Sequence, residues 1–323
     1  MRLAVIGCGF IGAKRATAAK GHDIVVVCDP DADRRDALAR QTGARAVADW
    51  HDALSADIDA ALIATTHDRL AEIALGAVRS GRHVLVEKPA GRTPQEARPI
   101  AEAAAKSGAT IKVGFNHRFH PALARAKALA EEGAIGPLLF IRGRYGHGGR
   151  LGYEKEWRFV PQISGGGELI DQGSHLIDLS RWFLGDLRLA YGAAPTYFWQ
   201  GKVDDNCFLA LEGRDGRMAW LHASWTEWKN LFSFEIMGKT GKLTIDGLGG
   251  SYGVERLTLH RMLPEMGPPE TTTWEYPFPD RSFVDEFANF IAAIEGRAPA
   301  VGSINDAIAN LEIVQAVYNR ARA

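Results

Sequence analysis

The feature that most constrains the fold of this chain is an alternation of short apolar runs and helix-like segments between residues 2 and 114. In the helix-like segments the apolar residues recur at spacings of three and four, whereas the runs are rich in β-branched residues. The runs lie at 2–6, 24–28, 60–64, 83–86 and 111–114. Because parallel strands need a crossover connection, this pattern predicts a parallel sheet with helices on both faces.

The second part of the chain has a different pattern, in which strand-like runs follow one another with short turns between them. Consecutive strands joined in this way predict an antiparallel sheet. The expected strands lie at 138–145, 196–199, 206–211, 217–224, 232–237, 242–245 and 256–259, and the expected helices at 119–132, 168–184, 283–295 and 304–321. We therefore expect an α/β protein with a first domain at 1–118 and a second at 119–323.

Composition excludes several classes of protein. The 39 acidic and 38 basic residues nearly balance, whereas a nucleic-acid-binding domain usually carries a basic patch. No apolar run approaches the roughly 20 residues that cross a bilayer, and the run at the N-terminus is too short for a signal peptide. Three cysteines without C-x-x-C spacing indicate neither a disulfide framework nor a zinc site. We expect a cytoplasmic enzyme without a metal, a nucleic-acid partner or a membrane partner.

A glycine loop follows the first apolar run. Residues 7–12 read Gly-Cys-Gly-Phe-Ile-Gly, which fits G-x-G-x-x-G between a strand and a helix. In such loops Gly7 permits the tight turn, Gly9 admits a pyrophosphate to the backbone, and Gly12 allows close packing of helix and strand. The start of the helix, at Phe10 and Ile11, then offers free N–H groups to phosphate. The alternative is that the glycines serve only a turn.

An acidic residue ends the second apolar run. Asp29 lies 22 positions after Gly7, where a carboxylate accepts hydrogen bonds from the ribose hydroxyls of NAD. The same carboxylate repels the 2′-phosphate of NADP, so NAD is the expected cofactor and NADP the less favoured one. The alternative is an ordinary turn aspartate before Pro30.

Glu87-Lys88-Pro89 follows the run at 83–86, where the ligand crevice of a parallel sheet lies. A lysine here can donate hydrogen bonds and a positive charge to a substrate oxygen near the nicotinamide. The alternative is a surface ion pair between Glu87 and Lys88.

Asp171 and His175 are four residues apart in the expected helix at 168–184 and therefore share one face. His175 is the natural proton shuttle, and Asp171 can orient its ring. Gly173 between them costs about 1 kcal/mol against alanine, which suggests close approach by cofactor or substrate. The alternatives are a surface ion pair and a metal site, but no third ligand has a helpful spacing.

The segment before that helix is rich in side chains that bind polar ligands. Its cations suggest a diphosphate, as in a nucleotide-linked sugar, or else solvated strand positions, and its aromatic rings suit stacking on a sugar. The cations are Arg142, Arg144, His147, Arg150 and Arg158, and the aromatic residues are Tyr145, Tyr153 and Trp157. Apolar residues of the later strands, namely Trp220, Trp225, Phe232 and Phe234, favour a homodimer or homotetramer formed through the second sheet.

Taken together, the glycine loop, Asp29, Glu87-Lys88-Pro89 and the Gly-Gly-Gly-x-x-x-Asp-x-Gly-x-His stretch resemble the Gfo/Idh/MocA oxidoreductase family. The resemblance implies a Rossmann domain followed by an α/β domain with an open, mostly antiparallel sheet. It also implies NAD(P)-dependent oxidation or reduction of sugars, cyclitols or their derivatives.

Carried onto this sequence, the resemblance makes Lys88, Asp171 and His175 catalytic. It implies that Lys88, Asp171 and His175 also contact the substrate, together with Tyr145, His147, Arg150, Tyr153 and Arg158. It implies cofactor contacts from Thr65, Thr66, His67, Glu87, Lys88, Asn116, Trp157 and Arg158, besides the glycine loop and Asp29. One departure is visible: Leu70 stands where the family often has a histidine, and His67 lies one turn earlier.

Two other functions remain open on the sequence. One is a glycoside hydrolase that oxidises its substrate transiently with tightly held NAD. The other is a non-catalytic NAD sensor, against which the intact Lys88, Asp171 and His175 argue.

Overall fold

The computed structural model describes residues 1–321 and divides the chain into two compact units. Unit 1 comprises residues 1–115, 162–165 and 283–311, and unit 2 comprises 116–161, 166–282 and the described chain from 312 onward. Residues 283–311 thus return to the unit in which the chain starts, a long-range contact that no local sequence pattern indicates.

Unit 1 is built on a six-stranded parallel sheet in the order β3-β2-β1-β4-β5-β6. The strands are β1 (Arg2–Ile6), β2 (Asp23–Cys28), β3 (Arg45–Val47), β4 (Ala60–Ile63), β5 (His83–Glu87) and β6 (Ile111–Gly114). This is the doubly wound order in which ligands bind where the strand order reverses, here beyond the carboxyl ends of β1 and β4.

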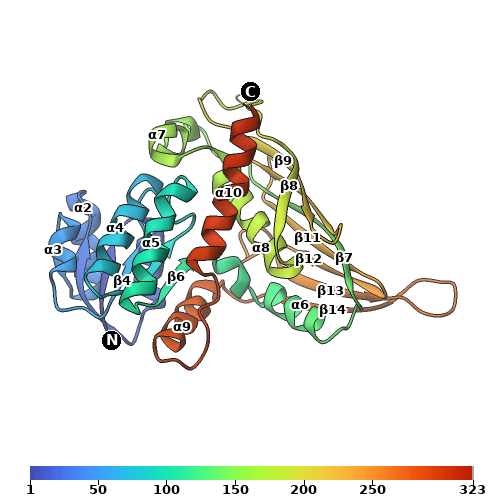
Figure 1. Ribbon diagram of the computed structural model, residues 1–323, viewed down its shortest axis with the longest axis horizontal. Helices are drawn as coiled ribbons and strands as arrows, with labels where there is room; N and C mark the ends of the chain where they lie inside the picture. The colour runs from blue at the N-terminus through green and yellow to red at the C-terminus, as the bar shows by residue number, and fades with distance from the viewer. Residues whose placement is uncertain (322–323) are drawn as a thin grey trace. The chain divides into compact units, whose positions relative to one another are not determined.

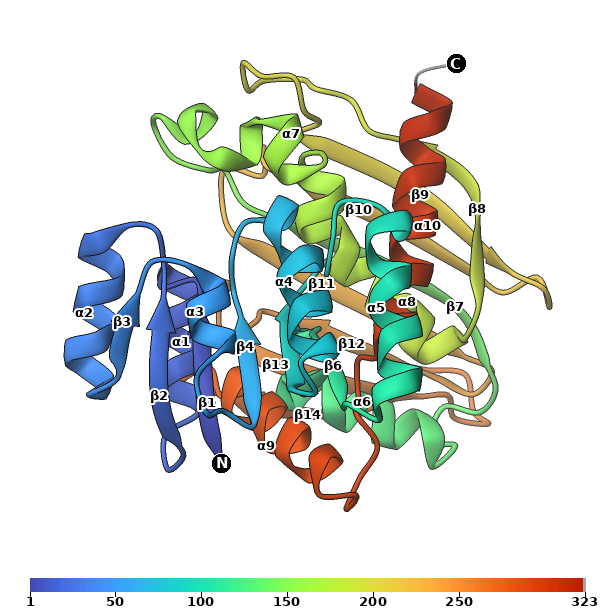
Figure 2. The same ribbon diagram turned by 60° about the vertical axis from the view of Figure 1, so that its left-hand side comes forward.

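Helices cover both faces of this sheet. They are α1 (Phe10–Ala18), α2 (Ala32–Thr42), α3 (Trp50–Leu54), α4 (His67–Arg79), α5 (Pro94–Ser107) and α9 (Ser282–Ile294). One core joins α1, α2 and α9 to the strands, and α9 contributes Phe287, Phe290 and Ile291 to it. On the other face α4 packs against α5, and the two run side by side in both views (Figures 1 and 2).

Unit 2 contains an eight-stranded sheet in the order β14-β13-β12-β11-β7-β10-β9-β8. Its strands are β7 (Leu138–Gly146), β8 (Leu187–Ala193), β9 (Asn206–Gly213), β10 (Met218–Ser224), β11 (Leu231–Gly238), β12 (Gly241–Asp246), β13 (Glu255–Arg261) and β14 (Glu270–Tyr276). All neighbours are antiparallel except β7 and β10, which pair in parallel. The predicted fold class, a parallel sheet followed by a mostly antiparallel one, is confirmed.

Helices α6 (Pro121–Glu131) and α8 (Ser174–Leu184) pack against the same face of the second sheet (Figure 1). Along β7 buried and exposed residues alternate: Ile141, Gly143 and Tyr145 are buried, whereas Arg142 and Arg144 are exposed. We call the face that carries the buried residues the inner face and the other the outer face. The remaining elements are η1 (Asn116–Phe119), η2 (Tyr153–Lys155), η3 (Trp157–Phe159), α7 (Pro161–Ser164), the π-turn η4 (Leu169–Gly173) and α10 (Ile304–Ala321).

Residues 168–184 are helical throughout, as expected, although the π-turn η4 precedes the α-helix α8. Other sequence-based expectations for individual elements are wrong. Residues 196–199 are not a strand, because they form a loop whose N–H groups bind a side chain rather than a neighbouring strand. Strands β3, β8 and β14 were not expected. Within residues 1–321 no helix combines the length and the apolar character needed to span a membrane.

Candidate functional site

The glycine loop has the geometry that its sequence predicts. Gly7 has a φ of +95°, and a Cβ there would lie 2.4 Å from the carbonyl oxygen of Ala64. A Cβ on Gly12 would lie 1.8 Å from the carbonyl oxygen of Gly7, so helix α1 can approach β1 only without a side chain at this position. A Cβ on Gly9 would meet no atom within 4 Å. The loop is therefore closed around Gly7 and Gly12 and open at Gly9, as a backbone that receives a phosphate must be.

Asp29 follows β2 and is tied to the glycine loop. Its Oδ2 accepts a hydrogen bond of 2.7 Å from the N–H of Cys8, and its Oδ1 accepts one of 2.9 Å from the N–H of Asp31. The carboxylate is buried. Each oxygen keeps a further lone pair, so Asp29 can still accept from two hydroxyl groups. The side chain of Arg35 donates to the main-chain oxygen of Asp29.

The loop after β4 lies against the glycine loop through the contact of Ala64 with Gly7. Thr66 caps α4, and its hydroxyl donates a 2.6 Å hydrogen bond to Asp68. His67 is buried, with its Nδ1 2.8 Å from the main-chain oxygen of Ser164. Leu70, at the position where the family often has a histidine, is fully buried in the core of unit 1 and therefore has a packing role.

A buried charge network holds Glu87, the residue before Lys88. Arg15 of α1 donates through Nε to Glu87 at 2.7 Å and through Nη1 to Glu286 of α9 at 2.5 Å. Burial raises the pKa of Glu286, against the lowering effect of Arg15. The position of Glu87 therefore depends on α1 and α9. The Lys88–Pro89 peptide bond is cis.

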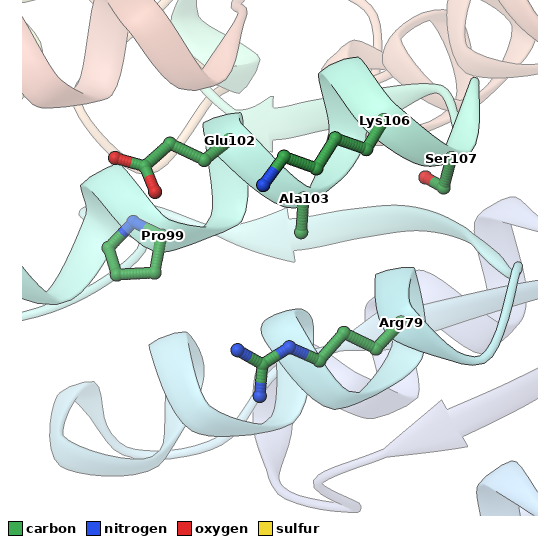
Figure 3. Close-up of a pocket in the computed structure, with 6 residues that line it drawn as sticks. All are labelled: Arg79, Pro99, Glu102, Ala103, Lys106 and Ser107. Carbon is green, nitrogen blue, oxygen red and sulfur yellow. The ribbon is translucent and has the colours of Figure 1, made fainter.

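One open pocket of about 330 Å³ lies between α4 and α5 (Figure 3). Its lining residues are Arg79, Pro99, Glu102, Ala103, Lys106 and Ser107. Arg79, Lys106 and Ser107 are at the carboxyl ends of these helices, which lead into the amino ends of the following strands. The pocket is thus at the opposite edge of the sheet from the glycine loop, where the chain offers no dinucleotide-binding turn.

In unit 2 the glycine triplet at 165–167 makes room for protein groups rather than for a ligand. A Cβ on Gly166 would lie 2.1 Å from the hydroxyl of Tyr318, and one on Gly167 would lie 1.8 Å from the carbonyl oxygen of Asp204. The carboxylate of Asp204 accepts hydrogen bonds from the N–H groups of Gly167 and Leu169, at 2.9 and 2.7 Å. These bonds fix the start of the π-turn that carries Asp171.

Gly173 also has a structural explanation. A Cβ there would lie 3.1 Å from Sγ of Cys207 on β9 and 3.3 Å from Leu169. The close approach expected from the sequence is therefore made by the sheet. The contact with Cys207 therefore accounts for this glycine without a cofactor or substrate.

Asp171 is paired with Arg158 of η3. The guanidinium donates through Nε to Asp171 at 3.0 Å and through Nη1 to Glu156 at 3.2 Å. Burial acts to lower the pKa of Arg158, but Asp171, Tyr153 and Glu156 together outweigh it, so the net shift is upward. The same guanidinium lies 4.7 Å from the ring of Trp157. Asp171, Arg158 and Trp157, which the sequence selected from separate motifs, thus form one group.

His175 begins the first turn of α8 and is buried on the inner face of the sheet. The ring of His117, from η1, stacks on it with centroids 3.7 Å apart and planes 17° apart. Tyr145 of β7 presents its ring to both, at 6.2 Å from His175 and 5.3 Å from His117. The sequence indicated His175 and Tyr145 as site residues but not His117.

The turn that carries His117 is fixed to α8. Arg118 donates to both carboxylate oxygens of Asp178, at 2.6 and 2.9 Å, and both side chains are buried. Asp178 lies one turn after His175 in α8, so this pair holds η1 beside the part of the helix that carries His175. Asn116, expected to contact cofactor, donates to the hydroxyl of Ser282 and lies 3.2 Å from Nδ1 of His117.

A second polar chain reaches the same face. The side chain of Gln172, in the π-turn, donates to the hydroxyl of Tyr252 at 3.1 Å, and Tyr252 and Tyr145 are hydrogen-bonded. Burial, with Tyr252 as the next cause, raises the pKa of Tyr145 well above its usual range, so its hydroxyl stays protonated. We call Asp171, Gln172, His175, Tyr145 and Arg158 the polar cluster.

The other expected substrate residues make contacts of different kinds. Arg150 is exposed and pairs with Glu156, which also accepts from Arg158 of the polar cluster. Tyr153 is buried in an aromatic core with Phe159, Val203 and Trp225, and His147 packs its ring on it. Burial lowers the pKa of His147, on which Asp171 and Arg158 also act electrostatically. Arg142 and Arg144 lie on the outer face, where Arg142 pairs with Glu235 at 2.9 Å, so these two are separate from the other three cations of the segment.

The sequence missed Arg15, Glu286, His117, Gln172 and Tyr252. Only Arg15 had a local signal, an arginine beside Ala16 and Ala19 on the apolar side of α1. The others become neighbours of site residues through contacts between distant segments. Within the described residues no three His, Cys, Asp or Glu side chains are arranged to hold a metal ion.

Comparisons with known proteins cover both units. Residues 1–115 match the profile described as "Oxidoreductase family, NAD-binding Rossmann fold", and residues 123–244 match the "GFO/IDH/MocA C-terminal domain". Levoglucosan dehydrogenase of Pseudarthrobacter phenanthrenivorans is 30% identical over 61% of this chain and 54% of its own. Inositol 2-dehydrogenase 2 of Saccharopolyspora erythraea is 31% identical over 67% of this chain and 64% of its own. The chain thus matches between about half and two-thirds of the length of these relatives.

Among solved structures, levoglucosan dehydrogenase in complex with NADH and L-sorbose superposes with a TM-score of 0.88. It is 24% identical, and the match covers 100% of this chain and 96% of that one, which shows that the fold is shared. The expected NAD-binding domain is confirmed by the profile match over residues 1–115. Matches to both domain profiles, in order along the chain, show that it belongs to the Gfo/Idh/MocA family of oxidoreductases.

Proposed function

We propose that this protein is an NAD-dependent dehydrogenase or ketoreductase that transfers hydride between nicotinamide and a hydroxyl-bearing or keto carbon of an uncharged sugar or cyclitol. The observation that carries the proposal is the polar cluster, which gathers Asp171, Gln172, His175, Tyr145 and Arg158 on one face of unit 2. Hydrogen-bonding groups packed this densely suit a polyhydroxylated molecule, because each hydroxyl needs a partner once it leaves water.

The residues of unit 1 fit NAD. The open position at Gly9 and the N-terminus of α1, with Phe10 and Ile11, would hold the pyrophosphate. Asp29 would accept from the ribose hydroxyls and repel a 2′-phosphate. The other proposed cofactor contacts are Thr65, Thr66, His67, Glu87, Lys88, Asn116, Trp157 and Arg158. When bound, NAD supplies the hydride acceptor, so the substrate loses two electrons and NAD becomes NADH.

In the oxidative direction His175 takes the hydroxyl proton of the substrate as general base, a role usually worth about 10²–10⁴-fold in rate. Lys88 donates a hydrogen bond to the same oxygen and stabilises the charge that develops there. Asp171 orients His175, and its ion pair with Arg158 keeps that carboxylate ionised. In the reductive direction the same groups act in reverse, with protonated His175 as the acid.

The charges of unit 2 favour a small uncharged substrate over a nucleotide-linked one. Arg158 is engaged by Asp171 and Glu156, Arg150 by Glu156, and Arg142 by Glu235. Arg142 and Arg144 also face the outer side of the sheet, away from the inner face that packs on α8. A diphosphate would have to displace existing carboxylate partners.

We further propose a homodimer or homotetramer formed through the outer face of the second sheet, and a reducing, cytoplasmic location. Trp220 of β10 is 60% exposed on the outer face, and Met218 lies two residues earlier on the same strand. Phe140 of β7 pairs with Met218, and Tyr191 of β8 pairs with Ala210, the residue of β9 opposite Trp220. Trp225, Phe232 and Phe234, which the sequence also suggested for an interface, are buried and cannot serve. The three free, buried cysteines support a reducing compartment.

The test is a substrate panel of free sugars, anhydro sugars, inositols and nucleotide sugars with NAD, followed by the absorbance of reduced nicotinamide. NADH should accumulate with at least one uncharged polyol, and nucleotide sugars should not be the only compounds that produce it. A hydrolase that oxidises its substrate transiently would release product without net NADH, and a sensor would bind NAD with no turnover on any substrate. Either result would refute the dehydrogenase proposal.

The matched variants are His175→Gln and His260→Gln. His260 lies on strand β13 and contacts Thr271 of the neighbouring strand β14, so its replacement controls for the loss of a histidine. We expect His175→Gln to lower kcat at least 100-fold while the Kd for NAD stays within about twofold. His260→Gln should match the wild type in both.

A further inference from the structure

The stacked rings of His117 and His175 form a pair of titratable groups in unit 2. Both residues are buried, at 5% and 6% exposure, and their ring centroids are 3.7 Å apart. Two imidazolium ions at this separation in a buried site repel each other strongly, just as two neighbouring carboxylates cannot both ionise. A neutral imidazole ring, in contrast, can stack on either a neutral or a protonated ring with little loss of free energy.

We propose that His117 and His175 share a single proton between them over the mildly acidic and neutral pH range, so that His117 is a positioning residue that sets the protonation of the catalytic histidine. The functional consequence rests on the proposed role of His175 as base. The inference that the two rings hold a single proton is argued from their stacking and does not depend on that role.

The orientation of His117 is defined by its neighbours. Asn116 donates its amide N–H to the hydroxyl of Ser282, which leaves its Oδ1 to accept from Nδ1–H of His117 at 3.2 Å. With Nδ1 donating, the position of His117 that gains and loses a proton is Nε2. The Arg118–Asp178 pair then keeps the ring over His175.

The charged groups around the stack already have partners of opposite sign. Asp178, on the helix of His175, is engaged by Arg118, and Asp171 is engaged by Arg158. These two pairs each sum to zero charge, so neither carboxylate stands free to compensate a second proton on the stack.

Two further elements pack against the stack. His120, whose ring lies 5.4 Å from that of His117, is paired with Glu255 of β13 at 3.0 Å. From β7 the stack faces Tyr145, a neutral hydroxyl at these pH values. Glu168, which precedes the π-turn, and Asp171 act electrostatically on Tyr145.

The consequence for His175 is an incomplete titration. A pair of rings that holds at most one proton distributes it over both, so His175 is uncharged in a substantial fraction of the molecules at mildly acidic pH. His175 thus remains available as a base where a lone histidine would be largely protonated. The second proton enters only at a much lower pH.

The experiment is an NMR titration of the full-length protein, with and without NAD, labelled with ¹³C at the Cε1 positions of histidine. Resonances of the pair are assigned with His117→Phe and His175→Gln. In the wild type we expect the chemical shift of His175 to change in two steps. About half of the change should occur near pH 6.5, and the rest at a pH about two units lower or more. In His117→Phe, which keeps an aromatic ring in the stack, His175 should titrate in one complete step.

His222→Phe is the matched control, since His222 also stacks on an aromatic ring, that of Phe208, but lies on the outer face of the sheet. It should leave the His175 curve unchanged. A single complete step for His175 in the wild type overturns the inference, whether or not His117→Phe folds. Full turnover in His175→Gln would instead refute the proposed function and leave the titration result standing.

Discussion

The carboxylate of Asp29 accepts a 2.7 Å hydrogen bond from the main-chain N–H of Cys8. The acid at the end of β2 and the glycine loop at the end of β1 are thereby held as one rigid piece. This bond fixes one oxygen of Asp29 toward the turn and leaves its remaining lone pairs for a ligand, which makes cofactor preference the most direct property to test.

Replacing Asp29 by serine removes the charge that binds ribose hydroxyls and repels the 2′-phosphate. We expect the affinity for NAD to fall about 10–100-fold and the NADP-to-NAD preference to rise, because charged hydrogen bonds contribute about 1.5–3 kcal/mol. Thermal shifts with each nucleotide measure both effects. Asp31→Ser, at the exposed cap of α2, is the control. Unchanged discrimination in Asp29→Ser would contradict the assignment.

Alanine substitutions at Gly9 and Gly12 should separate binding from folding. Gly12→Ala places a Cβ 1.8 Å from the oxygen of Gly7 and should lower the free energy of unfolding by about 3 kcal/mol. Gly9→Ala meets no protein atom within 4 Å, so Tm should hold or rise slightly while the thermal shift caused by NAD shrinks. Urea unfolding and NAD titration of both variants measure this, and a loss of stability in Gly9→Ala would show that the position is not open.

The buried Arg118–Asp178 pair should be costly to break on one side. Arg118→Leu leaves an uncompensated carboxylate and should destabilise unit 2 by about 3–5 kcal/mol, whereas Arg118→Leu with Asp178→Leu should recover much of that loss. Arg256→Leu breaks an exposed pair with Glu275 and should cost less than about 1 kcal/mol. Denaturant unfolding compares the three variants with the wild type. Equal losses from the exposed and buried single substitutions would contradict the role of burial.

Asp205 holds the loop at 197–199 through three main-chain N–H groups, at 2.9, 2.7 and 2.9 Å. Burial acts to raise its pKa, but these bonds and the amide of Asn206 outweigh burial, so the folded-state pKa is lowered. A lowered pKa means stability that is present above the unfolded value, near 3.9, and is lost as the pH falls through the folded value.

Asp205→Asn should therefore destabilise the protein by about 2 kcal/mol at pH 7, and its difference from the wild type should shrink below about pH 4. Tm measured from pH 3 to pH 8 tests the direction. Asp186→Asn, at a carboxylate that is 89% exposed, is the control and should stay close to the wild type throughout. A difference that grows on acidification would contradict the sign.

The outer face of the second sheet offers a test of assembly. Trp220→Glu places a charge at the centre of the proposed interface, and we expect the assembly to dissociate to monomers at micromolar concentration. Light scattering after size-exclusion chromatography gives the mass. Trp228→Glu changes a tryptophan that is similarly exposed, at 62%, but lies in the loop after β10, and it should leave the mass unchanged. Monomeric wild-type protein would refute this interface.

Local signals predicted unit 1 well. The glycines at 7 and 12 are required by contacts within a few residues or with an adjacent strand, so their spacing alone carries the information. Strand β14 was missed because its residues, Glu-Thr-Thr-Thr-Trp-Glu-Tyr, are mostly polar and exposed at a sheet edge. The parallel pairing of β7 with β10 joins segments about 70 residues apart, which no turn motif indicates.

The candidate site shows the same division. Asp171 and His175 are four residues apart and were found by spacing, whereas His117 reaches His175 from a segment 58 residues earlier in the chain. The close approach expected at Gly173 is made by Cys207, which comes 34 residues later in the chain, and the spacing within the helix could not identify that partner.

Helix α9 supplies Phe287, Phe290 and Ile291 to the core that also contains Leu3 and Leu85. On a ribosome this helix emerges after more than four-fifths of the chain has been made. Until then the nascent nucleotide-binding half has a bare apolar surface, and a recombinant fragment ending near residue 118 would keep that surface permanently. Such a fragment should aggregate unless residues 283–294 are fused back to it.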